Sequence, residues 1–325
     1  MALLRRSETV IAGILLLAMV LIGTINPAFW QLDNLFSLMR SNVIIGIMAL
    51  GVLLVLISGG IDVSFPAFAV AAMYLTIKGM LALGYNGVVL PLLAATIMGL
   101  LFGAVNGFFV YKFRMIPLIV TLGTSAMVRG FLLGVVGTSM ININKMPTAL
   151  IDFARTDVIS VTKADGTTYG LTAMVLIYLG LAVAMHLVLR YTMIGRSAYA
   201  LGGDPEAARR AGFDLRKTIF FIYCVAGALA GFAGLLHSGM IWLANPRDFV
   251  GLELDVIAAV VLGGASIFGG RGSVLGTMLG VFMLVMVKNS LIIMRVDTTW
   301  QLVVVGSIVI VATALSAWRD RRRTA

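Results

Sequence analysis

Long apolar runs separated by short charged connections constrain this chain more than any other feature. Of its 325 residues, 60% are hydrophobic and only 12% are charged, whereas a soluble domain usually carries about 25% charged residues to face water. The charges cluster between apolar runs that are long enough to cross a hydrocarbon core about 30 Å thick. The sequence therefore predicts an all-α membrane protein that crosses the bilayer many times.

The apolar runs predict about ten transmembrane helices. The first run follows Arg5 and Arg6, as in a signal peptide, but it is longer than a signal-peptide core and Asn26-Pro27 makes a poor cleavage site. We therefore expect residues 1–325 to form one polytopic domain that retains its first span. The expected spans lie near residues 9–28, 41–57, 65–83, 87–110, 116–137, 170–189, 218–239, 255–268, 274–293 and 301–318.

The distribution of Lys and Arg predicts the orientation, because basic residues concentrate in cytoplasmic connections. With the N-terminus inside, most of the 24 Lys and Arg residues fall on the cytoplasmic side, including the long connection at about 190–217. The charges of the connection at about 138–169 cancel, and we expect that loop to be periplasmic. An even number of spans then keeps the arginine-rich C-terminus inside, so both termini are cytoplasmic and the chain resides in a bacterial inner membrane.

Composition and motifs exclude several functions. The net charge of +10 does not indicate nucleic-acid binding, because the basic residues lie in short segments between apolar runs. His186 and His237 have no second ligand at the spacing of a metal site. The segment 264–271 imitates a phosphate loop but lacks the Lys-Ser/Thr pair that such a loop requires. The sequence thus predicts no enzyme, no metal site and no ATP site on this chain.

Glycines at four-residue spacing predict closely packed helices, because small residues on one face let two backbones approach inside lipid. Three sets show this spacing: Gly99, Gly103 and Gly107; Gly227 and Gly231; Gly272, Gly276 and Gly280. Glycines also interrupt the segments 58–64 and 263–272, one in each half of the chain, which hints at a duplicated architecture.

The most charged stretch, 195–217, predicts a short helix at the cytoplasmic surface. Gly202 and Gly203 end the preceding structure, Asp204 is a favourable N-cap, and Pro205 suits the first helical position. Glu206 then meets the positive end of the helix dipole and Arg209 and Arg210 the negative end, before Gly212 ends the helix. Two interpretations remain open on this ground alone, a solvated loop and a docking helix for a cytoplasmic partner.

At this point the chain resembles the membrane subunits of ATP-binding-cassette sugar importers, in the family of ribose, arabinose and autoinducer-2 permeases. The matching segments are Ser58-Gly-Gly-Ile-Asp62-Val-Ser64, Gly202-Gly-Asp-Pro-Glu-Ala-Ala-Arg209 with Gly212, and Glu253-Leu-Asp-Val-Ile-Ala-Ala-Val-Val-Leu-Gly-Gly264 with Gly269-Gly-Arg-Gly272. One departure is Phe65-Pro66, where the family usually has Val-Gly, and it bears on the substrate more than on the fold.

The resemblance implies a permease that carries a monosaccharide or related solute. It implies a second permease chain, identical or related, a periplasmic sugar-binding protein, and separate cytoplasmic subunits that hold ATP and magnesium, so that this chain binds no cofactor. It also implies an ATPase-coupling segment made of Gly202, Gly203, Asp204, Pro205, Glu206, Ala207, Ala208, Arg209, Arg210 and Gly212.

Polar residues within or beside the apolar runs are candidates for the translocation path. A buried Arg costs about 2.5–3.5 kcal/mol on insertion scales, so it is expected to face protein or water. Hydrogen bonding between helices is the favoured explanation for any single one, whereas Asp62 fits equally a brace for a broken helix and a lining residue. The candidates are Asn42, Asp62, Ser64, Asn106, Thr121, Arg129 and Asn289.

A self-sufficient secondary carrier is the alternative function. Such a carrier needs acidic residues buried in the middle of its spans to relay protons or sodium. Asp62 and Asp255 are both expected near span ends. The sequence therefore favours the importer subunit over the carrier.

Overall fold

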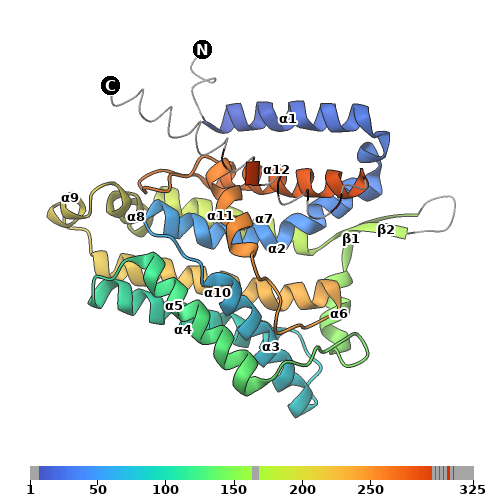
Figure 1. The fold of residues 1–325 in the computed structure, drawn as a ribbon, viewed down its shortest axis with the longest axis horizontal. Coiled ribbons are helices and arrows are strands. Elements are labelled where there is room, and N and C mark those ends of the chain that lie inside the picture. Colours follow the sequence, from blue (N-terminus) through green and yellow to red (C-terminus); the bar gives the residue numbers. More distant parts are fainter. Residues whose placement is uncertain are drawn as a thin grey trace.

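A computed structural model describes residues 7–162 and 168–294, together with residues 297, 300, 303, 306, 307 and 310. Helices dominate this part of the chain, and most of them run along the long axis of the molecule (Figure 1). Seven of the described helical segments are long and apolar enough to cross a membrane. They are α2 (Leu32–Ile57), α3 (Phe65–Leu83), α4 (Val89–Lys112), α5 (Pro117–Phe131) continued by the π-type turn η3 (Leu132–Val136), α7 (Met174–Tyr191), α10 (Leu215–Ile241) and α12 (Val274–Ile293).

The other described elements connect or flank these seven. They are α1 (Ser7–Ile25), the 3-10 turn η2 (Pro27–Trp30), α6 (Thr148–Arg155), β1 (Asp157–Thr162), β2 (Thr168–Thr172), α8 (Met193–Gly203), α9 (Pro205–Arg210) and α11 (Leu252–Leu262). The strands β1 and β2 pair antiparallel. This pair begins in the connection 138–169, where the sequence analysis expected only a loop, and β2 extends into the first residues of the expected span 170–189.

The expected spans agree with the helices over most of the described chain, and the main difference is the eighth. A span was expected at 255–268, but α11 has 11 residues, which at 1.5 Å per residue is about 16 Å, or half a hydrocarbon core. The helix stops at Gly263 because Gly264 adopts φ +88°, a conformation that glycine reaches without strain. The expected last span, 301–318, falls largely outside the described residues.

Helix α10 lies at the centre of the bundle and packs against α2, α3 and α4. Glycines allow its closest approach to α4. A Cβ atom built on Gly103 would lie 2.0 Å from the Tyr223 carbonyl oxygen, and one on Gly227 would lie 2.2 Å from the Gly99 carbonyl oxygen. The two predicted glycine rows therefore face each other, and backbone contacts backbone across the interface.

The third glycine row is only partly confirmed. A Cβ on Gly280 would come 2.1 Å from the Ala259 carbonyl oxygen, so α12 also meets α11 through glycine. Gly272, however, was predicted to share this helical face and does not, because α12 begins after it. Ser273 caps the helix by accepting a hydrogen bond from the Gly276 N–H at 3.0 Å.

The two long connections lie at opposite ends of the molecule. Figure 1 shows α8 and α9 at one end and the β1–β2 hairpin at the other. Near the hairpin, Ile141 and Ala244 exchange two backbone hydrogen bonds of 2.9 and 3.0 Å. This separation agrees with the expectation that 138–169 and 190–217 face different sides of the membrane.

The glycine contact between α4 and α10 generates a stability prediction. Gly103→Val places a branched side chain against the Tyr223 carbonyl, and overpacking of this kind costs about 1–3 kcal/mol or more. Gly180→Val on α7 is the matched control, because nothing lies within 4 Å of a Cβ there. Thermal unfolding in detergent, followed by size-exclusion chromatography, is expected to show a lower melting temperature for Gly103→Val alone. Equal melting temperatures for the two variants would contradict the packing described here.

Candidate functional site

The short helix α9 forms as the sequence predicts. The Asp204 carboxylate accepts hydrogen bonds from the N–H groups of Glu206 (2.9 Å) and Ala207 (3.1 Å), and so satisfies donors that the first helical turn leaves open. Arg209 pairs with Glu206 at 3.0 Å. Gly212, at φ +86°, ends the helix. Except for Ala208, the side chains from 204 to 210 are exposed, so this surface is accessible to a partner.

The preceding helix, α8, ends in backbone contact with two other segments. A Cβ on Gly202 would lie 1.9 Å from the Ile57 carbonyl oxygen at the end of α2. Gly270, in the loop between α11 and α12, donates its N–H to the same carbonyl at 2.8 Å. Gly269 also abuts Gly202, since its Cβ would lie 2.6 Å from the Gly202 carbonyl oxygen. We call the meeting of segments 57–60, 202–203 and 269–272 the glycine junction.

Side-chain hydrogen bonds secure α8 on both sides of the glycine junction. The Tyr199 hydroxyl donates to the Gly272 carbonyl at 2.8 Å. Ser197 and Thr218 share a buried hydrogen bond of 2.6 Å, which joins α8 to α10. As a result, α8 and the α11–α12 loop are positioned together, and α9 extends from the end of α8.

Four of the predicted path residues come together in one buried network, which we call the polar brace. Asp62 accepts hydrogen bonds from the Ser64 N–H (2.7 Å) and hydroxyl (2.6 Å). Asn106 on α4 donates to the Ser64 hydroxyl at 2.8 Å and accepts from Thr124 on α5 at 2.8 Å. Thr121 accepts from the Val63 N–H at 3.3 Å. The brace thus ties the 58–64 segment to α4 and α5.

Burial in the brace has an electrostatic consequence for Asp62, which lies between α2 and α3. Desolvation raises the pKa of the Asp62 carboxyl above its ordinary value, against the opposing effect of the hydrogen bonds from Ser64.

The Phe65-Pro66 pair that departs from the family pattern begins α3. Phe65 is buried next to the brace, and Pro66 occupies the first turn of α3, where a proline fits without losing a helical hydrogen bond.

The other three predicted residues lie apart from the brace and from one another. Asn42 is buried and donates to the Leu38 carbonyl within α2 at 2.7 Å. Asn289 on α12 donates to Asn34 at the start of α2 at 2.7 Å. Arg129 on α5 donates to two backbone carbonyls, those of residues 248 and 249, at 3.3 Å each.

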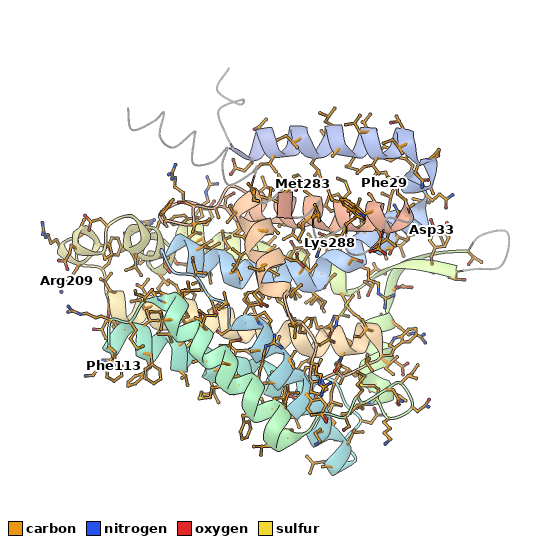
Figure 2. All side chains as sticks on the ribbon, in the orientation of Figure 1. Phe29, Asp33, Phe113, Arg209, Met283 and Lys288 are labelled. Carbon is orange, nitrogen blue, oxygen red and sulfur yellow. The ribbon has the colours of Figure 1, made fainter. Side chains whose placement is uncertain are left out.

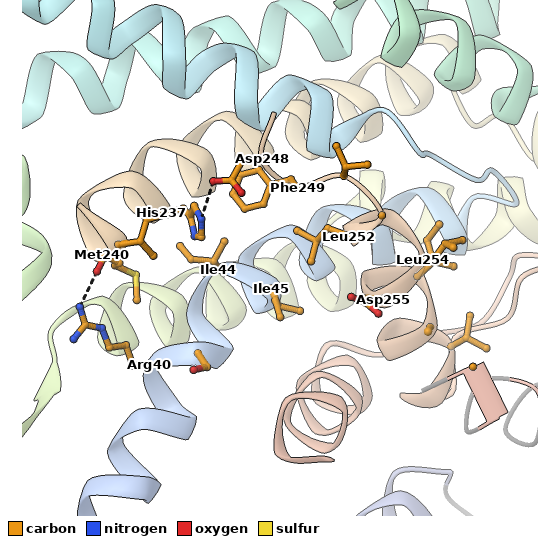
Figure 3. A pocket seen from close by; sticks show the side chains of 18 of the residues that line it. Arg40, Ile44, Ile45, His237, Met240, Asp248, Phe249, Leu252, Leu254 and Asp255 are labelled. Carbon is orange, nitrogen blue, oxygen red and sulfur yellow. Dashed lines mark hydrogen bonds and ion pairs between the residues drawn. The ribbon is translucent and has the colours of Figure 1, made fainter. Parts of the chain in front are cut away.

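A pocket of about 970 Å³ opens between α2, α10 and α11 (Figure 3). Its wall is mainly apolar, with a few polar groups from different helices. Within the described part of the chain, none of the seven predicted path residues lines it, although Arg129 holds the backbone of the 248–249 wall. The polar or charged side chains of the lining are Arg40, Ser41, His237, Asp248 and Asp255.

The polar groups of the pocket are held by specific partners. Arg40 donates to the Met240 carbonyl at 3.0 Å, and His237 lies 3.5 Å from the Asp248 carboxylate, as the dashed lines in Figure 3 mark. Asp255 forms an ion pair with Lys288, which lies well inside α12. The Phe249 ring packs 4.5 Å from the imidazole of His237, measured between ring centroids. The pocket therefore combines one aromatic face with fixed charges of both signs.

Sequence reasoning missed this set of residues. The sequence did contain one signal for it, the cation Lys288 within an apolar run. An unpaired cation inside a span costs free energy, so Lys288 needs an acidic partner. Finding that partner required knowing that α11 packs on α12. The described residues bring no three His, Cys, Asp or Glu side chains together as a metal site would require.

Comparison of the sequence with known proteins places this chain among transport proteins. The family described as "Branched-chain amino acid transport system / permease component" matches residues 34–313. A probable ABC transporter permease protein of Sinorhizobium fredii, y4mJ, is 33% identical over 98% of this chain and 92% of its own. The ribose import permease protein RbsC of Escherichia coli is 31% identical over 96% and 93%, and the D-allose transport system permease protein AlsC of the same species is 28% identical over 93% and 89%. No solved structure matches the chain.

Proposed function

Since this chain belongs to the family of branched-chain amino acid transport system permease components, we propose that it forms the membrane path for a monosaccharide or a related solute. It is the permease subunit of an ATP-binding-cassette importer, a multi-pass protein of the bacterial inner membrane. In this family the ATP-binding subunits are separate chains. The permease itself therefore carries the solute and hydrolyses no ATP.

A sugar substrate has two lines of support. Relatives over nearly the whole chain are named as ribose, allose and arabinose permeases. The pocket between α2, α10 and α11 is also within the size range of small-molecule sites, and its Phe249 ring offers an apolar face beside hydrogen-bonding groups. The Asp255 carboxylate does not support the alternative of a secondary carrier. It is already neutralised by Lys288, so it is not available to relay a proton or sodium ion.

The proposed topology has about ten crossings and both termini in the cytoplasm, within a single domain of residues 1–325. Its eighth crossing is made by the half-length helix α11 together with its flanking loops, which lead from Ala244, paired with Ile141, to Gly270 at the glycine junction. The end that holds α8, α9 and the glycine junction faces the cytoplasm, and the end with the β1–β2 hairpin faces the periplasm. The excess of Lys and Arg in the connection 190–217 supports this assignment.

The coupling segment, Gly202 to Arg210 with Gly212, is proposed to dock on a cytoplasmic ATP-binding subunit. ATP and magnesium act on that subunit, and this chain binds neither. On the other side, a periplasmic sugar-binding protein delivers the solute. A second permease chain, identical or related, completes the path. The exposed, rigidly capped surface of α9 supports the docking role.

The observation that carries the proposal is the link between the coupling segment and the pocket. Gly202 contacts Ile57 at one end of α2, and the other half of α2 supplies Arg40, Ser41, Ile44 and Ile45 to the pocket wall. The same glycine contacts the loop that follows α11, and α11 forms another wall. A displacement of α9 therefore acts at once on two elements that line the pocket.

The glycine junction suits this mechanical role because its contacts are made by backbone atoms. Flexible side chains between two helices can absorb a small shift by changing rotamer. Backbone atoms in van der Waals contact cannot, since closely packed interiors transmit strain. Helix α2, with 26 residues and a mostly buried surface, then conveys the shift across about 39 Å.

Two adjacent glycines provide a sharp test of coupling. A Cβ on Gly202 would lie 1.9 Å from the Ile57 carbonyl oxygen, whereas nothing lies within 4 Å of a Cβ on Gly203. Gly202→Ala is therefore expected to reduce sugar uptake by an order of magnitude or more, and Gly203→Ala to leave it near the wild-type rate. Uptake of labelled sugar in cells is measured beside membrane expression and co-purification of the ATP-binding subunit. Equal uptake by the two variants would show that transport does not require the contact at the glycine junction.

Cysteine labelling tests the topology. In a Cys224→Ser background, Ser160→Cys in β1 and Ala207→Cys in α9 each place one exposed thiol at opposite ends of the molecule. In intact cells whose outer membrane has been made permeable, an impermeant maleimide is expected to label Ser160→Cys only. In inverted membrane vesicles it is expected to label Ala207→Cys only. The reverse pattern, or labelling of both from one side, is incompatible with the proposed topology.

A further inference from the structure

We propose that this permease binds the headgroup of an anionic phospholipid at the end of the bundle that carries α9, in a basic pocket bounded by the α4–α5 turn, α9 and the start of α10. We call it the basic pocket. The proposal goes beyond solute transport and rests on the proposed function only for placing this end at the cytoplasmic surface of the membrane.

The basic pocket has a volume of about 710 Å³. One wall is the end of α4 and the turn after it, residues 110–112, 114 and 115. The opposite wall comes from Leu201 and from Pro205, Glu206 and Arg209 of α9, and the floor from residues 213–216 and 219. Figure 2 shows Phe113, in the turn, and Arg209, on α9, at the same end of the molecule. This pocket is therefore distinct from the one between α2, α10 and α11.

The charges that line the basic pocket leave a positive excess. Its two carboxylates are already engaged, because Glu206 pairs with Arg209 at 3.0 Å and Asp214 pairs with Lys217 at 3.3 Å. Lys112, Arg114 and Arg216 have no acidic partner among the described residues. Three unpaired cations around one hollow attract a phosphate group.

An exposed aromatic cluster lies beside these cations. Phe108, Phe109 and Phe113 contact one another with ring centroids 5.5–5.8 Å apart. Their exposed fractions are 44%, 37% and 58%. Apolar rings next to a basic hollow match both parts of a phospholipid, the acyl chains against the rings and the phosphate among the cations. Binding of a free phosphate ion would not explain the exposed aromatic rings beside the cations.

A water-soluble subunit explains the cluster less well. Phe108 and Phe109 lie within the last five residues of α4, along the flank of a predicted span rather than beyond its end. In the proposed topology this exposed flank faces lipid, while a cytoplasmic partner would meet the tip of the helix and α9. The basic pocket therefore lies where lipid headgroups meet the coupling segment.

Arg114 offers a variant that separates charge from fold. It adopts φ +53°, which a side chain makes unfavourable and glycine tolerates freely. Arg114→Gly therefore removes a cation and relaxes the backbone at the same time. The test variant combines it with Lys112→Gln. The matched control is Arg190→Gln with Arg196→Gln, which removes two exposed cations near the same end but outside the basic pocket.

The experiment uses the permease assembled with its partner subunits and reconstituted in nanodiscs and mild detergent. Phosphatidylglycerol and phosphatidylcholine are titrated, and the lipid retained per permease is measured by native mass spectrometry. The test variant is expected to lose affinity for phosphatidylglycerol by roughly ten- to thirty-fold, since each basic residue near an anionic headgroup contributes about 1 kcal/mol. Its melting temperature in lipid-free detergent and its retention of phosphatidylcholine are expected to match those of the control.

Three results would overturn the proposal. The first is equal phosphatidylglycerol affinity in the test and control variants. The second is displacement of the lipid by millimolar inorganic phosphate, which would identify a site for a free anion. The third is loss of the ATP-binding subunit from the test variant with lipid affinity unchanged, which would assign the basic pocket to that subunit.

Discussion

The contact on which the proposed coupling depends is made by backbone alone, at Gly202. Its α-carbon sits against the Ile57 carbonyl that also accepts the Gly270 N–H. One carbonyl oxygen thus joins the end of α2, the end of α8 and the α11–α12 loop. No residue with a side chain fits at that position without moving one of the three. These backbone contacts support the proposal that the coupling segment and the pocket walls move as one mechanical unit.

The same logic of close approach recurs through the membrane region. Lipid supplies no hydrophobic force between helices, so α4, α10, α11 and α12 gain their contacts through glycine faces, and the polar brace adds buried hydrogen bonds at the 58–64 segment. The brace holds this interrupted segment against α4 and α5 while the glycine junction holds it against α8. The pocket between α2, α10 and α11 then lies between elements that are anchored at the end of the bundle that holds α8 and α9.

Local sequence signals predicted most of the helices, whereas contacts between residues far apart in the sequence could not be predicted. The Asp204 cap, Pro205 and Gly212 encode α9 within nine residues, so the sequence alone predicts it, and hydropathy predicts most spans because each crosses the membrane by itself. The polar brace joins Ser64 to Asn106, and the pocket joins Asp255 to Lys288, each across tens of residues. Such partners are visible only once the helices are packed. The short α11 escaped prediction because an apolar run does not reveal where its glycines end the helix.

The measurement that tests the central claim most directly is the response of the pocket to ATP binding on the partner subunit. Spin labels at Met39 on α2 and Val250 before α11, both exposed, report the width of the pocket mouth by pulsed electron resonance in a Cys224→Ser background. With a non-hydrolysable ATP analogue, the distance distribution is expected to shift in the Gly203→Ala assembly and to stay unchanged in the Gly202→Ala assembly. The same shift in both assemblies would contradict the account, because the pocket would then respond without the glycine junction.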